Sequence, residues 1–233
     1  IEESPVFQEA RADLEQQQVA EAHLPILEVL RRYPREVLIA MGMRLAENIS
    51  YYIFTVISIT FIVDFGDGDK GPILQALLIG AAVQFTVIPL IGAWSDRVGR
   101  RPLYLVGAIG VGVWSFVFFG LVDSGREGLV VLAVVVGLIF HSLMYAPQAA
   151  FFSELFGTSV RYTGASVGYQ LASILAGALA PIIAVKLLAD PADPNTTAVA
   201  IYVAVASVLT VVAVLCAQET VNTSLRHDRV TGR

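Results

Sequence analysis

Near the middle of the chain stands Gly92-Ala93-Trp94-Ser95-Asp96-Arg97-Val98-Gly99-Arg100-Arg101-Pro102, a stretch that carries four charges between two long apolar runs. The runs, residues 73–94 and 103–122, are each long enough to cross a hydrocarbon core of roughly 30 Å as a helix. We therefore predict that the eight residues between them form a tight turn at the membrane surface, which Gly99 permits. Its arginines, Arg97, Arg100 and Arg101, indicate that the turn lies on the cytoplasmic side.

The composition is that of an integral membrane protein. The 233 residues are 56% hydrophobic and 15% charged, with a mean hydropathy of +0.70, values that a soluble domain with a polar exterior hardly sustains. The one cysteine, Cys216, excludes a disulfide within the chain. The N-terminus shows no secretory signal, and because the chain opens with Ile1 rather than methionine, we expect it to be a piece of a longer protein.

Six apolar stretches predict membrane-spanning helices at 37–63, 73–94, 103–122, 129–152, 164–189 and 198–217. The expected fold is an all-α membrane protein, with a cytoplasmic linker at 1–36, a six-helix bundle at 37–217 and a cytoplasmic tail at 218–233. Most of the 15 basic residues fall on the side of the turn at 92–102, whereas only Lys70 and Arg126 fall on the other side. This asymmetry places both ends of the segment in the cytoplasm.

The pattern G-x-x-x-D-R-x-G-R-R resembles the signature loop of the major facilitator superfamily. Its matching positions are Gly92, Asp96, Arg97, Gly99, Arg100 and Arg101. Residues 1–7 and 218–225 resemble the acidic sequences that end the sixth and twelfth helices of sugar porters and metabolite:proton symporters, and residues 44–48, 145–148, 153–156 and 160–164 resemble the latter family strongly. The resemblance implies the C-terminal half of a twelve-helix major facilitator fold, whose partners are a missing N-terminal six-helix half, the lipid bilayer, a small solute and protons.

The first span carries a polar stripe that we expect to bear function. At about 100° per residue, one helical face collects the polar side chains of the span. They are Arg44, Glu47, Asn48, Tyr51, Thr55 and Ser58, with Ile49, Ile53 and Val56 on the opposite face. Ionisable groups at membrane depth are costly unless they face protein or water, so the stripe is predicted to line a substrate or proton pathway. The alternative is that Arg44 and Glu47, at i and i+3, form a structural pair that holds helices together.

Two other spans add weaker polar candidates. In the fourth span, Tyr145 and Gln148 are expected to contact a polar solute, and His141, which titrates near neutrality when unperturbed, is a candidate proton relay, although a lone histidine of this kind is more often a packing residue. In the fifth span, Gln170 lies on a polar stripe that is expected to join the cavity. That span also repeats small residues at every fourth position, which predicts close helix packing: Gly164, Gly168, Ala172, Ala176 and Ala180.

A second group of charges lies on the predicted cytoplasmic side. Asp96 and the arginines of the signature loop fall on the same membrane face as Glu154 and Arg161, which flank the connection between the fourth and fifth spans. In the resembling families, this network latches neighbouring helices and is remade during alternating access. The alternative is that the arginines only determine topology. Because Asp96 contributes nothing to topology, we expect the latch.

Other classes of protein lack support in the sequence. Glu47 is the only acidic residue deep within a span, and the three histidines, His23, His141 and His227, are scattered, so neither an enzyme nor a metal site is predicted. No cofactor is expected, and no basic, aromatic surface predicts nucleic-acid binding. A membrane scaffold or sensor that retains the fold without transporting is the remaining alternative. We predict a secondary transporter of the cell membrane that couples symport of an organic acid, amino acid or betaine to protons by alternating access.

Overall fold

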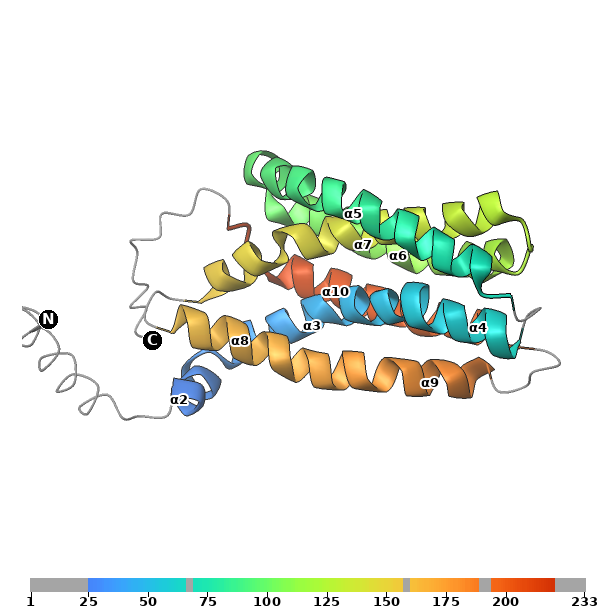
Figure 1. The fold of residues 1–233 in the computed structure, drawn as a ribbon. Coiled ribbons are helices and arrows are strands. Elements are labelled where there is room, and N and C mark those ends of the chain that lie inside the picture. The colour runs from blue at the N-terminus through green and yellow to red at the C-terminus, as the bar shows by residue number, and fades with distance from the viewer. Residues whose placement is uncertain (1–24, 66–68, 157–159, 189–193, 221–233) are drawn as a thin grey trace, which may run out of the picture.

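The chain is helical and contains no strand within residues 25–65, 69–156, 160–188 and 194–220, which the computed structural model describes (Figure 1). Six helical stretches are long and apolar enough to cross a membrane: Pro34–Asp64, Gly71–Val98, Arg100–Val122, Glu127–Leu155, Arg161–Leu188 and Thr196–Cys216. Each lies within a few residues of a predicted span, so the predicted all-α, multi-pass fold is confirmed. Most of the predicted linker and tail, residues 1–24 and 221–233, lies outside the described residues.

Two of the spans are built from several elements. The first contains α3 (Pro34–Tyr52), the π-helical segment η1 (Ile53–Ile57) and α4 (Ser58–Asp64). The fifth contains α8 (Arg161–Ala172), the π-helical segment η2 (Ser173–Ala178) and α9 (Leu179–Leu188). The others are α5 (Gly71–Val98), α6 (Arg100–Val122), α7 (Glu127–Leu155) and α10 (Thr196–Cys216). A short helix, α2 (Pro25–Arg32), packs beside α8 at one end of the bundle (Figure 1).

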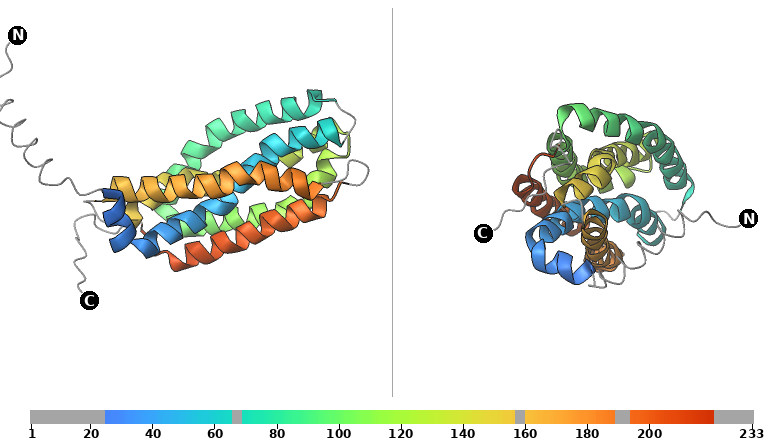
Figure 2. Two further views of the ribbon diagram at one scale, coloured as in Figure 1. Left: turned by 90° about the horizontal axis from the view of Figure 1, so that it is seen from below. Right: turned by 90° about the vertical axis from the view of Figure 1, so that its left-hand side faces the viewer.

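The spans run alongside one another, with α3 and α4 between α5 and α9 (Figures 1 and 2). Of the spans, α5 is the least covered by the rest of the described chain. On this helix Leu78 is 73% exposed and Phe85 is 85% exposed. Such apolar side chains suit a helix whose outer face is covered by lipid tails or by further helices.

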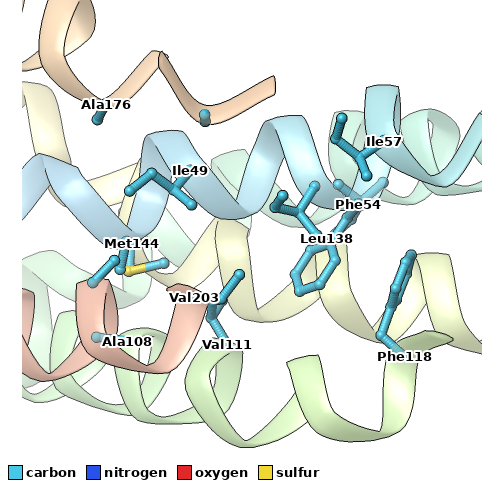
Figure 3. Close-up of a cluster of buried hydrophobic side chains, with 14 of the residues drawn as sticks. Ile49, Phe54, Ile57, Ala108, Val111, Phe118, Leu138, Met144, Ala176 and Val203 are labelled. Carbon is cyan, nitrogen blue, oxygen red and sulfur yellow. The ribbon is translucent and has the colours of Figure 1, made fainter. Parts of the chain in front are cut away.

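Large and small side chains interlock in the core. Phe54 and Phe118 meet with their ring centroids 4.7 Å apart (Figure 3). Gly137 makes room for this cluster, because a Cβ there would lie 2.9 Å from Phe54 Cδ2. The small-residue face of the fifth span packs closely against α3, as predicted. A Cβ on Gly168 would lie only 2.8 Å from the Cβ of Ala40, so a larger residue would push the two helices apart.

The π-helical segment η1 changes which residues share a face. A π turn holds an extra residue, so side chains beyond it are rotated relative to the α-helical pattern. Thr55 and Ser58, predicted on the polar face, instead donate to carbonyl oxygens of the preceding turn at 2.5 and 2.8 Å. The predicted opposite face is divided as well, because Ile53 is fully buried and Val56 is 43% exposed. The polar stripe therefore ends at Tyr51.

The turn between the second and third spans is much shorter than predicted. Both helices continue into the charged stretch, so that α5 ends at Val98, α6 begins at Arg100, and Gly99 alone joins them. Gly99 has a φ of 106°, a conformation that glycine adopts without steric cost. A Cβ at this position would also lie 2.7 Å from Glu219 Oε2. The prediction of an eight-residue turn is therefore wrong. The charged residues of this stretch lie in the last turn of α5 and the first turn of α6.

Candidate functional site

A cavity of about 410 Å³ opens between α3, α5, α7, α8 and η2. Its lining combines polar and aromatic side chains: Arg44, Glu47, Asn48, Tyr51, Tyr52, Gln84, Ile88, His141, Tyr145, Tyr169, Ser173 and Gly177. Four separate membrane spans contribute to this lining, so the cavity exists only once the bundle has formed. Polar groups from different helices thereby converge at a depth where each needs a partner or water.

Arg44 is the buried cation of the cavity, with 6% of its surface exposed. Its Nε donates to Ser173 Oγ at 3.2 Å, and its Nη1 donates to Glu47 Oε2 at 2.9 Å and to Gln148 Oε1 at 2.7 Å. The guanidinium lies over the ring of Tyr169, with Cζ 3.3 Å from the ring centroid. Within the described residues, Nη2 makes no hydrogen bond. Tyr169 thus covers one face of the guanidinium of Arg44, and Arg44 Nε and Nη1 are bonded. The N–H groups of Nη2 are left to bind another ligand.

Glu47 joins Arg44 to His141 across the interface of α3 and α7. Its Oε2 accepts from Arg44 and also from Gln148 Nε2 at 3.3 Å, while its Oε1 lies 3.1 Å from His141 Nε2. Glu47 and His141 are 4% and 3% exposed. The i, i+3 pair of Arg44 and Glu47 therefore exists, but it is one part of a larger buried network that also contains a titratable histidine.

Gln148 anchors this network to α6. Its Nε2 donates to the hydroxyl of Tyr104 at 2.8 Å, and that hydroxyl donates to the backbone oxygen of Met43 at 3.0 Å. Tyr104 is fully buried. The carboxamide of Gln148 thus contacts Arg44, Glu47 and Tyr104 at once, which holds the side chains of three helices in one arrangement.

Gln84 on α5 completes the surroundings of His141 and was not predicted from the sequence. Its Nε2 lies 3.1 Å from His141 Nδ1 and donates to Ser142 Oγ at 3.1 Å and to the backbone oxygen of Leu138 at 3.4 Å. Both ring nitrogens of His141 are therefore engaged, Nε2 by α3 and Nδ1 by α5. A signal for Gln84 did exist, because it is a glutamine inside an apolar span, where polar side chains are costly.

Aromatic rings cover His141 on the cavity side. The ring of Tyr51 lies 5.3 Å from that of His141, and the ring of Tyr145 stacks at 5.6 Å, centroid to centroid. Both tyrosines are a little over two-fifths exposed, at 44% and 43%, whereas Asn48 is 7% exposed. The cavity therefore presents tyrosine faces and hydroxyls beside one buried cation, a combination that suits a small amphiphilic solute.

A second polar cluster lies at the end of the bundle where α5 meets α6. This Arg100 cluster consists of Asp96, Arg100, Glu154, Glu219 and Thr220. Arg100 Nε and Nη2 bind the two oxygens of Glu154 at 2.7 and 2.8 Å, a bidentate pair. Arg100 Nη1 donates to Asp96 Oδ1 at 3.0 Å and to Ser95 Oγ at 3.2 Å. The hydroxyl of Thr220 donates to Glu154 Oε2.

Glu219 binds the start of α6 from the segment that follows α10. Its two carboxylate oxygens accept the backbone N–H groups of Arg100 and Arg101, each at 3.1 Å. A helix N-terminus carries unpaired N–H groups and partial positive charge, so a carboxylate there is stabilising. The side chain of Arg101 donates in turn to the backbone oxygens of Val214 and Leu215 at the end of α10. The ends of α6 and α10 are thereby tied together.

The family described as "Sugar (and other) transporter" matches residues 2–229, nearly the whole chain. The chain belongs to this family. Membership confirms the resemblance to the major facilitator superfamily. The match includes both α3 with its polar stripe and the joint between α5 and α6, and it extends beyond the described residues at each end.

Relatives of this transporter-family chain are known in Escherichia coli strain K12. The "Shikimate transporter" is 32% identical over 83% of this chain and 45% of its own length, and the "Inner membrane metabolite transport protein YhjE" is 32% identical over 97% and 50%. The "Proline/betaine transporter" is 25% identical over 97% and 45%. The chain thus spans about half the length of these curated relatives, which are named as transporters and not as enzymes. No solved structure significantly matches the chain.

Most of the pathway residues predicted for this transporter-family chain surround the cavity, and Gln148 joins the network behind its lining. Gln170, predicted to join the cavity, is exposed and is not among the residues that line it. Gly168 packs against α3, and Gln170 follows it by about 200° around the helix, so its side chain points away. The neighbouring Tyr169, missed in the sequence, stacks on Arg44 instead.

The predicted charge latch of the transporter-family chain is also assembled only in part. Asp96, Arg100 and Glu154 come together, but Arg161 does not join them, and its buried Nε has no hydrogen-bond partner among the described residues. Arg100 and Thr220 already occupy the carboxylate of Glu154. Arg97 is exposed, and a Cβ on Gly92 would meet no atom within 4 Å. Glu219 was missed as a partner, although the segment that contains it had been singled out by resemblance.

Proposed function

We propose that the chain is the C-terminal half of a secondary transporter, and that it takes part in proton-coupled symport of a small carboxylate-bearing metabolite such as an organic acid, an amino acid or a betaine. The observation that carries the proposal is Arg44, buried in the cavity lining with Nη2 unbonded among the described residues. A guanidinium offers parallel donors that match the two oxygens of a carboxylate. Relatives named for shikimate and for proline and betaine support a small polar solute of this kind.

Charge balance supports coupling to protons. In the empty cavity the charges of Arg44 and Glu47 cancel, and a neutral His141 satisfies both of its hydrogen-bond contacts. A bound organic acid adds a net negative charge in a medium of low dielectric, which is costly unless it is compensated, whereas a zwitterionic amino acid or betaine adds a carboxylate but no net charge. Compensation of the added charge is therefore needed most directly for an organic acid. A proton taken up by the pair of His141 and Glu47 restores neutrality. Solute and proton then bind more tightly together than separately, which is the thermodynamic requirement for symport.

The second half of the carrier is inferred from the exposure of this one. Transporters of this class place the solute near the bilayer midplane, between two repeats that rock against each other. The exposed face of α5 and the half-exposed Tyr51 and Tyr145 leave apolar and aromatic surface beside the cavity. We propose that an N-terminal six-helix half covers this surface, and that the solute site lies between the halves. Lipid covers the remaining apolar faces.

Orientation in the cell membrane follows from the basic residues. Arg35, Arg97, Arg100, Arg101 and Arg161 lie at the end of the bundle where α3 begins and α10 ends. Lys70 and Arg126 lie at the other end, before α5 and α7. Basic residues are retained on the cytoplasmic side, so we place the Arg100 cluster and both ends of the chain there.

The test is uptake by the full-length carrier that contains this chain, reconstituted into proteoliposomes. Labelled organic acids, amino acids and betaines are offered with an inwardly directed proton gradient and without one. We expect one carboxylate-bearing class to accumulate only when the gradient is present, and a proton ionophore to abolish the accumulation. Uptake that is the same with and without the proton gradient would contradict the proposed proton coupling. Absence of uptake in every class, with correctly inserted protein, would favour the scaffold or sensor.

A further inference from the structure

We infer that Gln84 is a positioning residue that keeps the shared proton of the His141 and Glu47 pair on His141 Nε2, so that His141 Nδ1 is the atom that takes up the next proton. The inference rests on the proposed proton coupling for its functional meaning. The placement of the proton itself follows from the hydrogen bonds around one imidazole ring. Gln84 contacts neither Glu47 nor Arg44 and acts only through His141.

The orientation of the Gln84 carboxamide is fixed by two acceptors. The backbone oxygen of Leu138, 3.4 Å away, can only accept a hydrogen bond. The hydroxyl of Ser142 donates its single proton to that same oxygen at 2.7 Å, so its own oxygen can only accept from Gln84. The atom of Gln84 that faces both groups must therefore be the nitrogen. This nitrogen also lies 3.1 Å from His141 Nδ1, and because an amide nitrogen does not accept a hydrogen bond, Nδ1 carries no proton. The two amide protons are shared among the three acceptors, of which the oxygen of Leu138 is the most distant.

The contact of the other ring nitrogen with Glu47 is consistent with the same tautomer. His141 Nε2 lies 3.1 Å from Glu47 Oε1, and Glu47 Oε2 accepts from both Arg44 and Gln148. A proton on Glu47 Oε1 would require a bare Nε2, and the neutral ring would then carry its proton on Nδ1. That proton would point at the N–H of Gln84. Gln84 thus excludes the arrangement in which the carboxyl holds the proton and the ring does not.

The next proton can bind only where a hydrogen bond is given up. Three donors surround the carboxylate of Glu47, whereas in the part of the chain that the structure describes Nδ1 of His141 is held by Gln84 alone. Protonation at Nδ1 breaks this one contact, and deprotonation restores it. The other groups that face the ring are the phenols of Tyr51 from α3 and Tyr145 from α7. Because Gln84 lies on α5, protonation of His141 also changes a contact of a helix that carries neither His141 nor Glu47.

Nitrogen chemical shifts of the histidine ring test the placement directly, without transport. The full-length carrier, purified with ¹⁵N-histidine, is compared with its His141→Gln variant to identify the signals of His141. We expect a neutral ring protonated at Nε2 in the wild type. In Gln84→Leu we expect signals of both neutral tautomers, since the amide that opposes a proton on Nδ1 is gone. A wild-type ring protonated at Nδ1, or an unchanged ring in Gln84→Leu, would overturn the inference.

The functional arm compares net uptake with exchange across a pH series. In Gln84→Glu a carboxylate replaces the amide beside Nδ1 and retains the proton, so proton-driven uptake should fall at least tenfold while solute exchange, which needs no proton release, continues. Thr86→Ala on the same helix, whose hydroxyl only contacts the backbone of α5, serves as the control. Loss of both uptake and exchange in Gln84→Glu would overturn the positioning role. Wild-type uptake without any proton dependence would refute the proposed coupling. The nitrogen chemical shifts of His141 would still decide which ring nitrogen carries the proton.

Discussion

The two polar clusters of this chain both pair an arginine with a glutamate, and they differ in what is left over. Arg100 has all three of its nitrogens engaged: Nε and Nη2 bind the two oxygens of Glu154, and Nη1 binds Asp96 and Ser95. Arg44 and its partner Glu47 are both buried, yet Arg44 Nη2 makes no hydrogen bond within the described residues. A guanidinium whose three nitrogens are all engaged fastens helices together, whereas one with an unbonded nitrogen beside a cavity is available to a ligand.

Exposure separates the two clusters as well. The side chains of Arg44 and Glu47 are 7% and 5% exposed, while that of Asp96 in the Arg100 cluster is 64% exposed. Solvent weakens the contribution of such an exposed charge, and burial raises the cost of losing a partner. We therefore expect mutations at the cavity to have larger effects than mutations at the Arg100 cluster, and effects of a different kind.

Arg44→Lys should give the largest effect. Lysine keeps the charge but lacks the planar guanidinium whose Nη1 binds Glu47 and Gln148 while Nη2 is left for the proposed carboxylate, and it leaves buried acceptors unpaired. We expect proton-driven uptake to fall about 100-fold, equivalent to ~3 kcal/mol. Initial uptake rates, corrected for the amount of carrier in the membrane, measure this. Val56→Ala, on the exposed side of the same span, is the matched control, and equal losses in the two variants would mean that Arg44 is structural.

Glu154→Gln should come next, with the opposite signature. The amide cannot bind the guanidinium of Arg100 through two charged oxygens, so the tie between α6 and α7 weakens by ~2 kcal/mol. We expect a lower thermal midpoint and a maximal uptake rate reduced about tenfold, with apparent affinity unchanged. Glu127→Gln, at the other end of α7, controls for loss of an acidic residue. A change in affinity alone would place Glu154 in the solute pathway and erase the distinction between the clusters.

Tyr51→Phe should have a smaller effect, confined to binding. The ring that covers His141 is retained, and only a hydroxyl beside the cavity is lost. One hydrogen bond to a solute corresponds to about a fivefold weaker apparent affinity, with maximal rate unchanged. Concentration series of uptake in the variant and in Tyr162→Phe, a tyrosine that is 87% exposed, decide the matter. If both variants shift the affinity equally, Tyr51 does not contact the solute.

Asp96→Asn should have the smallest effect of the four. Its carboxylate contributes one contact to Arg100, which stays bound to Glu154 and Ser95, and solvent reaches most of the side chain. We expect a reduction of less than about threefold in maximal rate, with normal affinity and normal insertion. Kinetics of the purified variant at low and high salt measure it. A loss as deep as that of Arg44→Lys would show that exposure is a poor guide here.

Much of the architecture was predictable because it depends on local sequence. Hydropathy located the six spans to within a few residues, and helical periodicity placed the residues from Arg44 to Tyr51 on one face. The same periodicity failed beyond Tyr51, because the π turn at η1 inserts a residue that no apolar pattern announces. It failed again at Gln170, where the packing of Gly168 against α3 decides which side of α8 faces the cavity.

The missed partners share a different cause. Gln84 meets His141, Tyr169 meets Arg44, and Glu219 meets the start of α6 only through contacts between distant segments. A single sequence shows that each is a polar or aromatic residue in or beside an apolar span. Which residue it meets depends on how two helices are rotated and how deep each lies in the bundle. Polar residues of α3 and α7 could therefore be assigned to a site from the sequence, whereas the residues that they meet on α5 and α8 could not.

The joint at Gly99 makes α5 and α6 a linkage without slack. Successive Cα atoms are about 3.8 Å apart, so α5 cannot shift along its axis by more than a few ångströms without dragging the first turn of α6. That turn is clamped by Glu219 on its backbone and by Glu154 on Arg100. Near the middle of α5, Gln84 contacts the imidazole of His141. If α5 moves along its axis during the proposed proton uptake, the first turn of α6 must move with it, whereas a longer connection would absorb the displacement.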